Sequence, residues 1–132
     1  MKGLFKLLTV CMLMLNITTT MAQQNQVTRK DLFKAMMNQI VTNVDIKEVT
    51  VPVGQIVPKH LHPCPVVGYV VSGNVLFQIE GEEFQILKAG DVFYEPKDKT
   101  ILHFDNASKD QPLTFIAFYL KEGVEENVKI LN

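Results

Sequence analysis

The chain has 132 residues and is almost neutral, with 13 Lys and Arg against 14 Asp and Glu. This length accommodates one small domain but not two. No strong basic patch is available, so nucleic-acid binding is excluded, because it needs clustered Lys and Arg facing the phosphates.

The first 22 residues are typical of a secretory signal peptide. Lys2 and Lys6 form a basic start, an apolar stretch follows over residues 7–17, and Thr20-Met21-Ala22 offers small residues at the cleavage site. The apolar stretch is short for a transmembrane span. We therefore expect cleavage after Ala22, a secreted or periplasmic mature protein, and no stable membrane insertion after cleavage. An uncleaved membrane anchor is the alternative.

Residues 23–43 are expected to form a helical segment ahead of the main domain. Thr28 and Asp31 have the spacing of a capping box, with Asp in place of the usual Glu or Gln. The apolar residues that follow recur at helical spacing. They are Leu32, Ala35, Met36 and Ile40, with Phe33 and Met37 broadening the apolar face.

From residue 44 to residue 132 the pattern changes to short strands separated by turns. Val49, Val51 and Val53 alternate with residues 48, 50 and 52, which is the period of a half-buried strand. Further strands are expected over residues 66–71, 75–79, 84–86, 92–95, 101–104 and 113–120, with turns or polar loops between them. Many short strands joined by turns indicate an all-β, double-sheet jelly-roll barrel.

The last expected strand, LTFIAFYL over residues 113–120, is apolar on both faces. Together with Leu76 and Leu87, which we interpret as facing outward, it implies more buried surface than one barrel interior supplies. A homodimer packed sheet to sheet would cover this surface. The alternative is that the amino-terminal helix covers it within one chain.

The three histidines of the chain are placed where two strands could bring them to one metal ion. His60 and His62 form an H-x-H pair, and side chains two apart on a strand point to the same face. His103 follows about forty residues later. Neutral imidazole is a good ligand for transition metals, and three protein ligands leave positions free for water or substrate. We therefore expect one divalent ion, Fe, Mn, Zn or Ni, on these histidines.

The residues around the pair resemble the first of two sequence motifs of the cupin superfamily. That motif reads Gly, five residues, H-x-H, three or four residues, Glu, six residues and Gly. The stretch from Gly54 to Gly73 keeps both histidines, but Val66 stands in the position of the glutamate. The anionic ligand of the motif is therefore missing there. Glu95 or Asp98 is the candidate for a compensating carboxylate.

The second cupin motif reads Gly, five residues, Pro, one residue, Gly, two residues, His, three residues and Asn. Gly90 and Pro96 fit it, whereas Asp98 replaces the second glycine and Ile101 replaces the histidine. His103 lies two residues later, a shift that preserves the face of a strand, so we expect it still to point inward. Asp98 is interpreted as serving the turn, since Asp tolerates the backbone conformation that glycine would supply.

The resemblance covers most of residues 44–120 and implies the double-stranded β-helix of cupins, a small barrel with a single metal site inside. It does not select one activity, because the superfamily includes dioxygenases, isomerases, decarboxylases, sugar-binding modules and storage proteins on one scaffold.

Two functions stay open from the sequence. The first is a mononuclear metal enzyme, a dioxygenase or isomerase acting on a small organic molecule, with Glu95 relaying protons. The second is a non-catalytic barrel that binds a small ligand beside a degenerate, metal-free site. Its ligand would be enclosed by four aromatic residues, Tyr69, Phe77, Phe93 and Tyr94. The survival of all three histidines favours the first function, and the missing carboxylate and displaced histidine favour the second.

Overall fold

The structure is a computed structural model that describes residues 26–132, so the expected signal peptide lies outside the described residues. All of the strands belong to one compact unit, residues 31–132. Residues 26–132 contain no helix long and apolar enough to cross a membrane.

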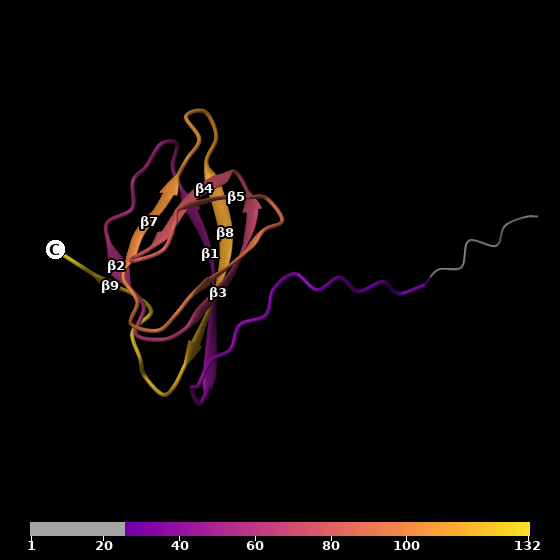
Figure 1. The fold of residues 1–132 in the computed structure, drawn as a ribbon, viewed down its shortest axis with the longest axis vertical. Coiled ribbons are helices and arrows are strands. Elements are labelled where there is room, and N and C mark those ends of the chain that lie inside the picture. The colour runs from indigo at the N-terminus through magenta and orange to yellow at the C-terminus, as the bar shows by residue number, and fades with distance from the viewer. Residues whose placement is uncertain (1–25) are drawn as a thin grey trace, which may run out of the picture. The chain divides into compact units, whose positions relative to one another are not determined.

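The strands form two antiparallel sheets (Figure 1). The four-stranded sheet has the order β1-β8-β3-β6 and consists of β1 (Asn43–Val51), β8 (Leu113–Lys121), β3 (Val66–Ser72) and β6 (Val92–Glu95). The five-stranded sheet has the order β5-β4-β7-β2-β9 and consists of β5 (Gln85–Lys88), β4 (Asn74–Ile79), β7 (Ile101–Asn106), β2 (His60–Leu61) and β9 (Lys129–Ile130). The expected all-β jelly-roll fold is confirmed.

The core lies between the two sheets. A cluster of four phenylalanines joins them, with ring centroids 4.8 Å apart for Phe93 and Phe104 and 4.8 Å apart for Phe104 and Phe115. Phe77 completes the cluster from β4. Leu87 on β5 pairs with Val75 and is buried in the same core, so our interpretation of Leu87 as outward-facing was wrong.

A β-bulge interrupts the pairing of β7 with β4. Ile79 is opposite Ile101 and Gln78 is opposite His103, so Leu102 is an extra residue between two consecutive pairs. An extra residue reverses the alternation of side chains beyond it. As a result Ile101 and Phe104 are both buried, whereas the side chain of His103 is 43% exposed.

The expected helix ahead of the barrel is not formed, since residues 26–42 have no helix or strand. The apolar side chains of that expected helix are left largely uncovered, with Met36 85% and Ile40 67% exposed. A helix of this length is marginal in water unless its apolar face packs against something, and most of these side chains are not packed on the barrel. The segment leads into β1 through hydrogen bonds at its end, including Thr42 N to the Lys121 carbonyl at 2.8 Å.

Candidate metal centre

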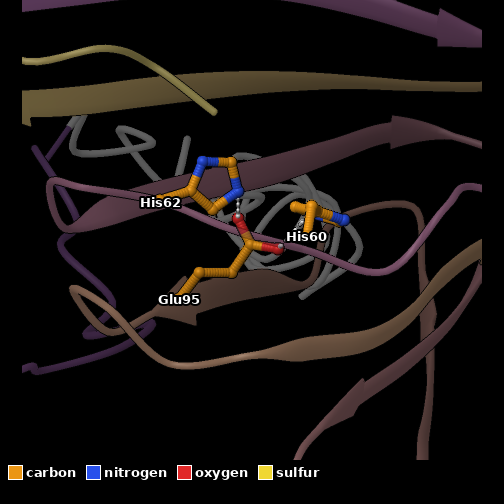
Figure 2. A group of neighbouring side chains, drawn as sticks. All are labelled: His60, His62 and Glu95. Carbon is orange, nitrogen blue, oxygen red and sulfur yellow. Dashed lines mark ion pairs between the residues drawn. The ribbon is translucent and has the colours of Figure 1, made fainter. Parts of the chain in front are cut away.

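His60, His62 and Glu95 form a buried cluster inside the barrel. One ligand atom of each lies within 4.8 Å of the other two. The Nε2 atom of His62 is 3.1 Å from Oε2 of Glu95, and Nε2 of His60 is 4.0 Å from Oε1 of the same carboxylate. Figure 2 shows the carboxylate of Glu95 directed at the His62 ring, with His60 beside it. The H-x-H pair and the candidate carboxylate are thus brought together.

Main-chain carbonyls orient both imidazoles. Nδ1 of His60 donates to the Pro58 carbonyl at 2.8 Å, and Nδ1 of His62 donates to the Asn127 carbonyl at 2.5 Å. A carbonyl oxygen only accepts, so Nδ1 must carry the proton of each neutral ring. The lone pair of each neutral imidazole is then on Nε2, the atom that faces Glu95. This is the tautomer that a metal ligand needs.

A strained turn helps to hold His62 in place. Asp98 has a φ of +58°, in the left-handed region that favours glycine. Its N–H donates to the His62 carbonyl at 2.9 Å. Asp98 therefore serves the turn in place of the glycine of the second motif, as expected, and Glu95 is the residue that joins the histidines.

Glu95 lies one strand away from the missing glutamate of the first motif. Val66, which occupies that motif position on β3, is the direct register partner of Glu95 on β6. Both side chains are buried, and partners in a sheet project from the same face with Cβ atoms about 4.5 to 5.5 Å apart. A carboxylate thus enters the barrel beside the position where the motif would place one.

The donor set fits a divalent transition metal. Two imidazoles and one carboxylate that leave other positions open are the set that non-haem Fe(II) oxygenases use, and Zn and Mn accept the same ligand types. Oε1 of Glu95 is buried without a hydrogen-bond partner among the described residues. An unpaired buried carboxylate oxygen is costly, and a cation between it and the two Nε2 atoms would remove that cost.

The ionisation of His62 is tied to this carboxylate. Burial lowers the pKa of His62, but the hydrogen bond to Glu95, the negative charge of Glu95 and the Asn127 carbonyl together raise it above the usual 6.5. In the metal-free protein the pairing with Glu95 therefore favours a proton on Nε2 of His62. A metal ion would take the place of that proton.

The predicted three-histidine site is not confirmed, because His103 does not join the cluster. Its Nδ1 atom lies 2.7 Å from Oδ2 of Asp105, two residues along the same strand, and its side chain is partly exposed. The bulge at Leu102 reverses the face that we had extrapolated from the two-residue shift. Ile101, fully buried, occupies the register position opposite His60.

The cluster lies at the edge of a cavity of about 240 Å³. The rest of the lining is almost entirely apolar and comes from β1, the loop between β1 and β2, β7, β8 and the carboxyl-terminal segment. It includes Val49, Val51, Phe104, Phe115, Val128 and Ile130. The cavity is smaller than the roughly 300 to 1,000 Å³ pockets of drug-sized ligands, so it suits a small organic molecule.

Tyr119 is the one further polar side chain in the lining, and our sequence reasoning missed it. It lies in register with Val66, as Glu95 does, and its ring centroid is 5.7 Å from that of His62. Burial, with a smaller contribution from Glu95, raises its pKa to about 12. The alternation of Leu113, Phe115, Ala117 and Tyr119 could have indicated it, but both faces of β8 are apolar and give the strand no clear inner side.

The four aromatic residues expected around a ligand do not line this cavity. Phe77, Phe93 and Tyr94 line a second cavity of about 200 Å³ instead, and Tyr69 is 40% exposed. Tyr94 contacts Phe33 of the amino-terminal segment, with ring centroids 6.1 Å apart. Phe104, Phe115 and Tyr119 are the aromatic residues of the lining instead.

The family model described as the cupin domain matches residues 47–119, which is more than half of the chain. The chain belongs to the cupin family. No curated protein sequence matches it significantly.

Solved cupin structures share this fold. A cupin-like protein from Thermotoga maritima is 26% identical, with a TM-score of 0.57 over 68% of this chain and 65% of its own. The DMSP lyase DddQ from Ruegeria pomeroyi is 22% identical, with a TM-score of 0.57 over 66% of this chain and 42% of its own. Oxalate decarboxylase from Bacillus subtilis is 23% identical, with a TM-score of 0.57 over 67% of this chain and 24% of its own. This cupin thus spans less than half the length of the two enzymes.

Proposed function

We propose that this cupin binds one divalent transition metal through His60, His62 and Glu95 and acts on a small organic molecule in the adjoining cavity. The observation that carries the proposal is the buried carboxylate of Glu95, whose Oε1 has no hydrogen-bond partner among the described residues and whose two oxygens face the Nε2 atoms of His60 and His62. Among structures of the same fold, the oxalate decarboxylase of Bacillus subtilis holds Mn(II) centres.

The ion would supply Lewis-acid chemistry and open coordination positions, and the facial-triad donor set favours Fe(II) and an oxygenase or isomerase reaction. The residues of the chain have separate roles. The carbonyls of Pro58 and Asn127 hold the imidazoles in the ligating tautomer. Glu95 supplies negative charge as a ligand rather than relaying protons. Tyr119, a residue of the cavity lining, provides a hydroxyl that can donate a hydrogen bond to the ligand.

Calorimetric titration of chelator-treated protein with Mn(II), Co(II) and anaerobic Fe(II) tests the metal site. We expect about one ion per chain, and at least a 100-fold loss of affinity in His62→Ala. His103→Ala is the matched control, because it removes an imidazole outside the cluster, and its affinity should stay within twofold of the wild type. Equal losses in the two variants, or no uptake by the wild type, would reject the proposal and favour a metal-free ligand-binding barrel.

Addition of azide to the Co(II)-loaded protein tests for open coordination positions. A change in the visible absorption spectrum is expected, because azide binds where substrate or water would bind. An unchanged spectrum at saturating azide would indicate a closed, structural site, in which case the metal assignment would stand without the proposed reaction.

We also propose that the protein is exported and cleaved after Ala22. The support is the basic start, the apolar stretch and the small residues of the first 22 positions. Amino-terminal sequencing of the protein made in a secreting host should begin at Gln23. A chain that retains Met1 and stays in the cell membrane would indicate an uncleaved anchor.

We further propose a homodimer that packs through the outer face of the four-stranded sheet. Ile46, Phe118, Val67 and Tyr94 form one register row across this face, and Ile46 is 61% exposed. Light scattering coupled to gel filtration should give twice the chain mass. Ile46→Glu should give the monomer, whereas Glu48→Gln on the next row should not. A monomeric wild type at micromolar concentration would contradict this arrangement.

A further inference from the structure

The charges around the cavity are unevenly distributed. His60, His62 and Glu95 lie at one end, and no Lys or Arg is among the residues that line the cavity. Lys121 is the lysine that lies two residues beyond Tyr119 on β8. Its Nζ atom is 3.2 Å from Oδ2 of Asp45, so its charge is already compensated. Within residues 26–132, the cavity lining therefore offers no Lys or Arg to a ligand.

The proposed metal site sets how much negative charge a ligand can carry. A divalent ion with one carboxylate and two neutral imidazoles has a net charge of +1. One anionic headgroup neutralises it. A second anionic group would lie against the apolar lining without a partner, and burying an unpaired charge is strongly unfavourable.

The hydroxyl of Tyr119 provides a donor at the same end of the cavity. Glu95 and Tyr119 are both register partners of Val66, from the strands on its two sides, so the three residues form one row on the inner face of the sheet. Tyr119 lines the cavity, and a tyrosine hydroxyl can donate a hydrogen bond. From this row it can donate to an oxygen of a headgroup bound at the cluster.

The opposite end of the cavity is hydrocarbon. Val49, Val51, Phe104 and Phe115 form an apolar wall, and Ala117 leaves room beside it because its side chain is short. Phe115 pairs with Val49 and lies four residues before Tyr119 on β8, which places this wall away from the cluster. Val128 and Ile130 are 43% and 53% exposed and lie at the side open to solvent. Burial of apolar ligand surface on this wall is worth about 25 cal/mol per Å².

Taken together, the lining points to a small monoanion with a hydrocarbon body, such as a monocarboxylate or an enolate, as the ligand class. Its anionic oxygen is bound at the metal and by Tyr119, and its body lies on the wall of valines and phenylalanines. This inference rests on the proposed metal site. It makes Tyr119 a specificity-determining residue and excludes dicarboxylates as good ligands.

Three six-carbon probes test the inference on the Co(II)-loaded protein by calorimetry. Hexanoate is the monoanion, adipate carries a second carboxylate on the same carbon chain, and hexanol has no charge. We expect hexanoate to bind at least tenfold more tightly than either of the others, and tenfold more tightly than acetate, which lacks the body. Adipate binding as tightly as hexanoate would overturn the charge argument. Acetate binding as tightly as hexanoate would overturn the role of the apolar wall.

Two variants distinguish a failure of this inference from a failure of the proposed metal site. Tyr119→Phe should lower hexanoate affinity by about tenfold, and Ala117→Leu should lower it further by filling the cavity, while Co(II) affinity changes less than hexanoate affinity in both. Ile116→Leu, on the outer face of β8, is the matched control and should leave hexanoate binding unchanged. Metal uptake without any preference for hexanoate would reject this inference alone. Failure to take up metal would reject it together with the proposed function.

Discussion

Two histidine–carboxylate pairs of this barrel lie within hydrogen-bonding distance, an inner one and an outer one. His62 directly follows β2 of the five-stranded sheet, Glu95 ends β6 of the four-stranded sheet, and the two side chains meet 3.1 Å apart in the interior. His103 and Asp105 come from the same strand and are closer, at 2.7 Å, but the histidine side chain is 43% exposed. The His103–Asp105 contact is therefore the shorter of the two, although no further metal ligand lies beside it in the described part of the chain.

The difference between the pairs lies in their surroundings. The inner pair has a second imidazole beside it, a carboxylate oxygen without a partner and a cavity next to it. In the outer pair, Asp105 is already satisfied, because its Oδ1 atom accepts a hydrogen bond from Val57 N at 2.8 Å. A short contact between a histidine and a carboxylate indicates a metal site only where other ligands converge and bonding capacity is left over.

The largest expected effect is the loss of metal affinity when the carboxylate of the inner pair is removed. Glu95→Val should lower metal affinity by about a thousandfold, because the charge interaction of a carboxylate with a cation is worth on the order of 4 kcal/mol at about 4 Å. The double variant Val66→Glu/Glu95→Val returns the carboxylate to the adjacent strand and should recover most of the loss. Calorimetric titration with Co(II) measures both. A double variant no better than Glu95→Val would show that position 66 does not face the two imidazoles.

A substitution that displaces β6 should weaken the contact between His62 and Glu95, because β6 carries Glu95. Gly68 pairs with Phe93, and a Cβ atom at Gly68 would lie 1.9 Å from Cζ of the Phe93 ring. Gly68→Ala should therefore destabilise the protein by about 1 to 3 kcal/mol and shift β6, which carries Glu95. Urea unfolding and metal titration should both report a loss. Val67→Ala, on the outer face beside it, should leave metal affinity unchanged, and equal losses in both would contradict the role given to Gly68.

A histidine on the inner face of β7 should supply the third imidazole that His103, on the outer face, does not. Ile101 is buried and opposite His60, so Ile101→His should place a new ligand at the cluster and raise metal affinity by about tenfold, or 1.4 kcal/mol. The metal-free variant should be less stable than the wild type, since it buries a polar ring in place of an apolar side chain. If Ile101→His binds metal no better than the wild type, the inner face of β7 does not reach the site.

The smallest expected effect is on pH dependence. The folded-state pKa of His62 is raised above 6.5, so its pairing with Glu95 stabilises the metal-free protein fully below pH 6.5 and is lost as pH rises through the raised value. A metal ion needs neutral imidazole, so stabilisation by metal should instead grow over the same window. Thermal unfolding at pH 6, 7 and 8, with and without Co(II), measures both trends. His62→Gln should remove the loss of stability that the metal-free protein shows as pH rises. A metal-free wild type that becomes more stable between pH 6 and pH 8 would contradict the pairing of His62 with Glu95.

Much of the architecture could be predicted from the chain. Alternation in residues 49–53 and 75–79, the turns at glycines 73, 81 and 90, and the two motifs indicated the strands and the cupin barrel. The amino-terminal helix was predicted from the spacing of Leu32, Met36 and Ile40, and it failed because spacing cannot supply a surface for an apolar face to pack on.

For the candidate site too, one part could be predicted from the sequence and another part could not. The H-x-H spacing by itself determined that His60 and His62 share a face, because alternation with a period of two is a property of a single strand. Tertiary structure decided the rest. The bulge at Leu102 turned His103 outward, and the pairing of β6 with β3 brought Glu95 beside the valine that replaces the motif glutamate. Alternation is local, whereas bulges and partners between strands arise only when distant segments pair, so the third ligand could not be chosen from the sequence.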